Sequence, residues 1–148
     1  MVRIVAFLAL LFTALALVPV GAHLFSLPNK IGMPQEAYFV AQSIYNGWWR
    51  MAFILIPAML LQIAFTYLLR DEQFAFFASL VACACLASTL LVFFAWTQPA
   101  NAATENWTIV PSGWEDLRRQ WEYSHAANAG LTFASFCLLA LSTLSMRR

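Results

Sequence analysis

The stretch Ser112-Gly-Trp-Glu-Asp-Leu-Arg-Arg-Gln-Trp-Glu-Tyr-Ser-His125 leads directly into an apolar run that ends at Met146. It is the place in the chain where charged, aromatic and titratable residues share one helical register. Steps of four, three and four residues put a set of them on one face of a helix: Trp114, Arg118, Trp121 and His125. We therefore expect the chemistry of this protein near this face.

A single long helix is predicted for residues 113–146. Ser112 and Glu115 have the spacing of a capping box, which indicates where the helix begins. At about 1.5 Å per residue, such a helix is on the order of 50 Å long, well beyond a hydrocarbon core of roughly 30 Å. We expect residues 124–146 to cross the membrane and residues 113–124 to project from it on the outer side.

The composition places the chain in a bilayer. Of its 148 residues, 62% are hydrophobic and 10% are charged, and the mean hydropathy is +0.71. About a quarter of the residues of a soluble domain are charged, so this chain would leave too much apolar surface in water. A net charge of +1 argues against nucleic acid as a partner. We expect an all-α protein whose main partner is the lipid bilayer.

Residues 1–148 are expected to form one domain, an integral membrane four-helix bundle. The predicted spans are residues 4–27, 47–69, 74–97 and 124–146, with an interfacial helix at 35–45. The basic start and Val20-Gly21-Ala22 resemble a signal peptide, but the run is long enough to span, so we expect a retained first helix. The link 70–73 is short, which makes the second and third spans antiparallel neighbours.

Four spans put both termini on one side of the membrane. Arginines flank the spans on that side, which the positive-inside rule makes cytoplasmic: Arg3, Arg70, Arg147 and Arg148. Asn106-Trp107-Thr108 is a glycosylation acceptor pattern, but nothing else points to a eukaryotic secretory pathway. We therefore expect a bacterial inner (plasma) membrane.

The two histidines of the chain are both expected at the outer boundary. His23 ends the first span and His125 begins the fourth. They could share a haem b or each bond to backbone or water, but they lack the paired spacing of a metal site, so no metal is predicted. The three cysteines lie in apolar runs as packing residues, with no disulfide expected.

The helical face of residues 114–125 has two interpretations. Glu115, Arg119 and Glu122 can form a solvated face with helix ion pairs, while Arg118 turns inward beside His125 to bind an oxygen of a ligand. Asn128 lies one turn further along the same face, where a buried amide needs either a helix or a ligand as its partner.

Several short motifs are similar to the anthrone-oxygenase-like family of small four-helix membrane proteins. They are Gln98-Pro99-Ala100-Asn101, Trp114-x3-Arg118-x2-Trp121-x3-His125, and Gly21-Ala22-His23 at the end of the first span. The named members oxidise anthrones to anthraquinones without a known metal or flavin. The resemblance implies a ligand site lined by Asn101, Arg118, Trp121 and His125, with His23 facing them, and it implies no cofactor.

Two functions of different kinds follow. The first is binding of a flat, apolar, oxygen-bearing molecule such as a quinone or anthrone, with His125 and Arg118 as catalytic residues of a cofactor-free oxygenase. Its ligand-binding residues would be His23, Asn101, Trp114, Trp121 and Asn128. The second is a non-catalytic accessory subunit of a larger membrane complex, whose aromatic spans pack on partner helices. A homo-oligomer suits the first function, and a bis-histidine haem b carrier is a third interpretation.

Overall fold

The computed structural model describes residues 1–146, whose regular elements are all helical. The long helices are α1 (Val2–Lys30), α3 (Ala52–Leu68), α4 (Gln73–Val92) and α6 (Trp114–Ser145). The short ones are α2 (Gln35–Gln42), η1 (Ser43–Tyr45), η2 (Trp48–Met51), the π-helical turn η3 (Phe93–Thr97) and α5 (Gln98–Ala103). Four stretches are long and apolar enough to cross a membrane, each built around one of the long helices. The prediction of an all-α chain with four such helices is confirmed.

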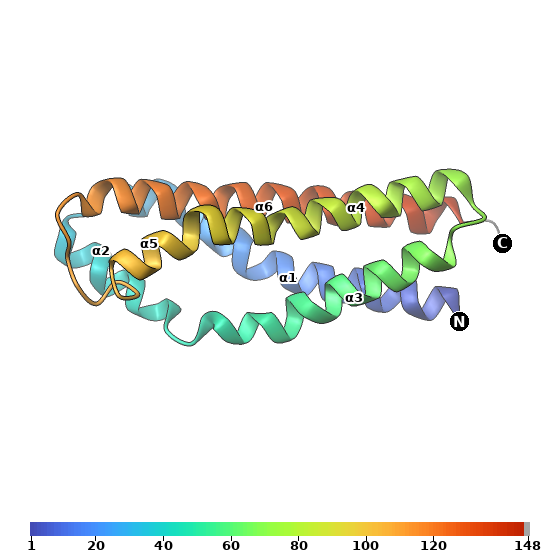
Figure 1. The fold of residues 1–148 in the computed structure, drawn as a ribbon, viewed down its shortest axis with the longest axis horizontal. Coiled ribbons are helices and arrows are strands. Elements are labelled where there is room, and N and C mark those ends of the chain that lie inside the picture. Colours follow the sequence, from blue (N-terminus) through green and yellow to red (C-terminus); the bar gives the residue numbers. More distant parts are fainter. Residues whose placement is uncertain (147–148) are drawn as a thin grey trace.

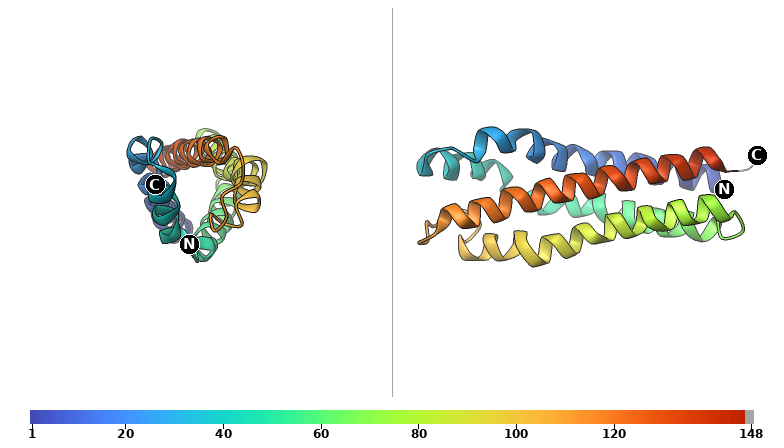
Figure 2. Two further views of the ribbon diagram at one scale, coloured as in Figure 1. Left: turned by 90° about the vertical axis from the view of Figure 1, so that its left-hand side faces the viewer. Right: turned by 90° about the horizontal axis from the view of Figure 1, so that it is seen from above.

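The four long helices lie side by side (Figures 1 and 2). Helix α6 packs along both α1 and α4, and α3 packs along α1. Helix α3 meets α4 near the tight turn that joins them and diverges from it further on (Figure 1). The chain begins and α6 ends at one end of the molecule (Figure 1), here the terminal end, while α2, α5 and the loops around them form the distal end.

The terminal half is held by close contact of small side chains. Its buried core combines alanines of α1 and α4 with a few larger residues: Ala6, Ala9, Phe65, Leu69, Ala75, Ala82 and Leu139. Small residues let helix backbones approach closely, which provides the packing attraction that lipid tails cannot supply by exclusion.

A buried amide joins three helices in this half. Gln62 Nε2 on α3 donates to Thr13 Oγ1 on α1 at 2.9 Å and to Ser135 Oγ on α6 at 3.1 Å. Ser135 Oγ in turn donates to the carbonyl of Ala82 on α4 at 2.8 Å. Within an apolar bundle these polar side chains satisfy one another, so they fix the rotation of each helix about its axis.

Two helices continue past prolines that we expected to end them. Helix α1 contains Pro28 and ends at Lys30, not at Leu27. Pro28 removes one backbone hydrogen bond, but the extra turn buries Lys30 where it finds partners, described below. Pro99 lies just after the π-helical turn η3, inside a helical stretch that runs without a break from Gln73 to Ala103. The predicted polar segment from residue 100 therefore begins as helix.

The predicted capping box does not form. Helix α6 begins at Trp114, and its N-cap is Gly113 with φ of 78° and no side-chain hydrogen bond. Ser112 thus lies one residue before the capping position, too far from the first turn to accept from its N–H groups. A left-handed φ is the conformation that glycine adopts at little cost.

Replacing Gln62 should weaken the bundle because Thr13, Ser135 and the amide lose their shared hydrogen bonds. We expect Gln62→Leu to lower the free energy of unfolding by about 1 kcal/mol, measured by titrating the folded protein with a denaturing detergent and following circular dichroism. Ser88→Ala is the control, because Ser88 Oγ bonds only to the Ala84 carbonyl of its own helix. Equal stability of Gln62→Leu and the wild type would contradict this role.

Candidate functional site

Aromatic rings gather around the two histidines at the distal end. The rings of His23 on α1 and His125 on α6 stack with centroids 4.0 Å apart and planes 17° apart. Trp121 lies 4.2 Å from His125 and 5.0 Å from His23, and Tyr45 and Trp48 lie 4.4 and 5.3 Å from His23. These five rings are called the imidazole cluster. The structure thus brings together two histidines from opposite ends of the sequence.

A buried ion pair lies next to this cluster. Lys30 Nζ is 2.8 Å from Glu122 Oε1, and the two side chains are 5% and 0% exposed. Tyr38 donates a hydrogen bond to the same carboxylate oxygen at 3.0 Å, and Lys30 donates to the Tyr45 hydroxyl at 3.0 Å. The ammonium also lies 4.8 and 4.9 Å from the ring centres of Tyr45 and Trp121. A buried charge needs such partners, since leaving water costs several kcal/mol.

Placing Glu122 on a solvated face was wrong. Glu122 is buried and pairs with Lys30, a residue that no sequence pattern predicted to belong to the site. Arg119 pairs at the surface with Asp116 at 2.6 Å. A signal for Glu122 existed in the register, because it lies four residues after Arg118 and three before His125 on the inward face.

Arg118 points inward and is 8% exposed. Its Nη1 donates to the carbonyl of Met33 at 2.7 Å, and the guanidinium lies 4.6 Å from the ring centre of Trp114 and 5.4 Å from that of Tyr38. It therefore ties α6 to the start of α2 and holds Trp114. Its contacts are at the outer edge of the distal end, away from the stacked imidazoles.

Asn101 on α5 holds two tryptophans at once. Its Oδ1 accepts from Trp121 Nε1 at 2.9 Å and from Trp107 Nε1 at 3.2 Å. Trp107 is the last of three consecutive non-glycine residues with left-handed backbone, at φ 47°, 58° and 67° for positions 105–107. Each such residue costs about 1–2 kcal/mol. The Thr104 hydroxyl, which accepts from the Trp107 backbone N–H at 3.0 Å, helps to hold this turn.

Several buried polar atoms of the distal half have no hydrogen-bond partner within residues 1–146. They are His23 Nδ1, Gln42 Oε1, Arg118 Nε, Glu122 Oε2 and Asn128 Oδ1. Asn128 is 6% exposed one turn beyond His125, and His23 is 4% exposed. An unpartnered buried polar group costs about 1–3 kcal/mol, so such a concentration indicates a place where a ligand or water completes the bonding.

The imidazole pair does not fit a haem. Trans ligation puts the two rings on opposite faces of a porphyrin, with their nitrogen lone pairs pointing at one iron. Here the rings stack face to face, so their lone pairs lie in nearly parallel planes and no macrocycle fits between them. Within the described part of the chain, no three His, Cys, Asp or Glu side chains gather as a metal site.

Removing one member of the buried ion pair should destabilise the protein strongly. We expect Lys30→Met to lower the free energy of unfolding by about 3 kcal/mol, because Glu122 is left as an uncompensated buried charge. Lys30→Met combined with Glu122→Gln should recover a large part of that loss. Arg119→Ala breaks the exposed pair and should change stability by less than about 1 kcal/mol. Additive losses in the double variant would contradict the pairing.

The phenol of Tyr38 should make stability depend on alkaline pH. Burial raises the pKa of Tyr38 above its ordinary value, and the adjacent Glu122 carboxylate raises it further. The unfolded chain then loses this proton first, so the contribution of Tyr38 is complete below about pH 10 and declines above it. We would measure the free energy of unfolding by denaturation between about pH 9 and about pH 11.5. It should fall less steeply with pH for Tyr38→Phe than for the wild type. Tyr67→Phe, at an exposed ring, should keep the wild-type slope.

No protein-family model matches this chain, and no curated protein or solved structure matches it. The resemblance to the anthrone-oxygenase-like family therefore stays a prediction. The function has to be inferred from the imidazole cluster and its surroundings.

Proposed function

We propose that this protein is a four-span integral membrane protein with both termini in the cytoplasm and the distal end at the outer boundary. Arg3 and Arg70 belong to the terminal end, while Arg147 and Arg148 lie outside the described residues. At the distal end, Lys30 and Arg118 are buried, while Arg50 and Arg119 lie at the surface. We base the orientation on the arginines predicted to flank the spans at the terminal end, by the positive-inside rule. The assignment to a bacterial inner membrane remains a prediction.

We infer that the imidazole cluster binds a flat, apolar, oxygen-bearing molecule of the quinone or anthrone type. The observation that carries this inference is His23 Nδ1, a buried atom without a partner inside a wall of aromatic rings. Aromatic walls favour a flat ring, and the unpartnered nitrogen and Asn128 Oδ1 favour one that offers polar groups at its edge. Binding would remove the cost of leaving these atoms unbonded.

The chemistry proposed for the site is proton transfer by histidine. In an anthrone, the carbon opposite the carbonyl is acidic enough to lose a proton to His125, and the resulting carbanion reacts with O₂. That carbon gains a carbonyl oxygen and water is the other product, so no further oxidant is needed. Arg118 Nε also lacks a partner, but Arg118 contacts no ring of the imidazole cluster, so we assign it to a polar group of the ligand that extends from the cluster towards Trp114.

The test measures oxidation by the purified protein in lipid nanodiscs. We expect O₂ uptake with an anthrone, no Soret absorption, and a loss of about 10²-fold or more in turnover for His125→Ala. Thr143→Ala is the control on the same helix, because its hydroxyl bonds only to the Leu139 carbonyl. Unchanged turnover in His125→Ala would end the catalytic proposal, and co-purification of other membrane subunits in mild detergent would favour the accessory role.

A further inference from the structure

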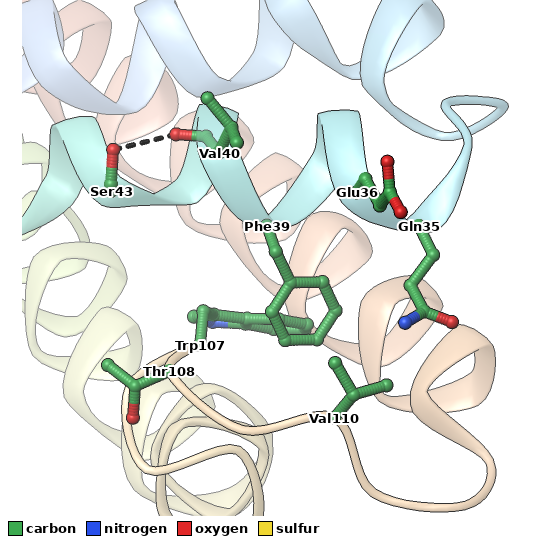
Figure 3. Close-up of a pocket in the computed structure, with 8 residues that line it drawn as sticks. All are labelled: Gln35, Glu36, Phe39, Val40, Ser43, Trp107, Thr108 and Val110. Atoms are coloured by element: carbon green, nitrogen blue, oxygen red, sulfur yellow. Dashed lines mark hydrogen bonds between the residues drawn. The ribbon is translucent and has the colours of Figure 1, made fainter.

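A concave surface lies at the distal end, separate from the imidazole cluster. It is a groove of about 510 Å³ between α2 and the loop that follows α5 (Figure 3). The groove is lined by Gln35, Glu36, Phe39, Val40, Ser43, Trp107, Thr108 and Val110. Its volume falls in the range of small-molecule sites, about 300–1,000 Å³. This surface is called the distal groove.

The apolar part of the distal groove is held in place by the contacts of its aromatic residues. The rings of Phe39 and Trp107 meet edge to face with centroids 5.6 Å apart, and Val110 stands beside Phe39 (Figure 3). The Trp107 indole is fixed from behind by its hydrogen bond to Asn101 at 3.2 Å. An apolar body of one or two rings would therefore meet a preformed surface, which reduces the ordering cost of binding.

The polar rim of the groove includes two hydroxyls and a carboxylate, which accept hydrogen bonds, and the Gln35 amide, which can donate and accept. Ser43 Oγ already donates to the Val40 carbonyl at 2.7 Å, and Thr108 Oγ1 donates to the Glu105 carbonyl at 2.7 Å. Because each hydroxyl has one hydrogen, both oxygens can only accept from a ligand. Glu36 is the one ionisable side chain among the described lining residues, and its carboxylate also accepts only. A matching ligand donates hydrogen bonds and carries positive charge.

We propose that the distal groove binds protonated amphipathic amines, with the apolar body on Phe39, Val40 and Val110 and the ammonium at Glu36. The ammonium N–H groups would donate to the Glu36 carboxylate, while Ser43 and Thr108 lie at the opposite end of the groove (Figure 3), beyond reach of the same ammonium. The ligand is a free small molecule with an aromatic or alkyl body. This site is independent of the oxidation proposed for the imidazole cluster, so either can fail without the other.

Equilibrium dialysis of 2-phenylethylamine and its neutral counterpart 2-phenylethanol against nanodiscs of zwitterionic lipid tests the proposal. Binding to empty nanodiscs is subtracted. We expect the wild type to bind the amine about fivefold more tightly than the alcohol, as a partly exposed ion pair allows. Glu36→Gln should remove that preference and leave the affinity for the alcohol unchanged.

Two further variants separate charge recognition from general effects. Glu115→Gln removes an exposed carboxylate on α6 that does not line the groove, so it should keep the wild-type preference. Val110→Ala should weaken both ligands equally, because it shortens the apolar wall. Equal affinity of the wild type for amine and alcohol, or loss of the preference in Glu115→Gln, would overturn the proposal. Tetramethylammonium has no N–H and no apolar body. If it bound as tightly as 2-phenylethylamine, the proposal would be overturned, and lipid headgroups would be the favoured ligands of the groove.

Discussion

The distal half of this protein depends on the buried ion pair between Lys30 and Glu122. The pair joins the last residue of α1 to the middle of the outer part of α6. Around it, Tyr38 brings in α2 and Tyr45 brings in η1, each by one hydrogen bond. Trp121, adjacent to Glu122 in the chain, lies under the ammonium and against both histidines. The Lys30–Glu122 ion pair thus positions Trp121, and through it the imidazole cluster.

The two halves of the molecule are stabilised by different forces. In the terminal half, alanines allow close backbone contact, and the polar side chains around Gln62 bond to one another. In the distal half, charged and aromatic side chains dominate, and buried atoms such as Glu122 Oε2 remain without partners. Among residues 1–146, the buried polar side chains around Gln62 all have partners, which suits a scaffold. The distal half has buried polar atoms without partners and a strained turn at positions 105–107, and both features are typical of a ligand-binding site.

Hydropathy was sufficient to predict four helices of membrane length, because bilayer thickness dictates how many apolar residues a span needs. It could not predict where α1 ends, because Pro28 signals a break and only the distant Glu122 makes the extra turn favourable. The helical register predicts an inward Arg118 and Trp121, and Glu122, one residue after Trp121, also points inward and is buried. The motif Gln98-Pro99-Ala100-Asn101 predicted Asn101 as a site residue. Its hydrogen bond from Trp107 depends on the left-handed backbone of Trp107, which no local sequence pattern predicts.

One atom, the Oδ1 of Asn101, accepts hydrogen bonds from a residue of the distal groove and from a residue of the imidazole cluster. Trp107, which lines the groove, and Trp121, which contacts both histidines, donate to that oxygen. A carboxamide oxygen has two lone pairs, so it can satisfy both indoles only if each keeps its direction. If Trp107 moved away from Asn101 by more than about 0.5 Å, its hydrogen bond would exceed a good distance. Asn101 would then keep only its hydrogen bond from Trp121. The orientations of the Trp107 and Trp121 indoles are therefore linked through a single side chain on α5.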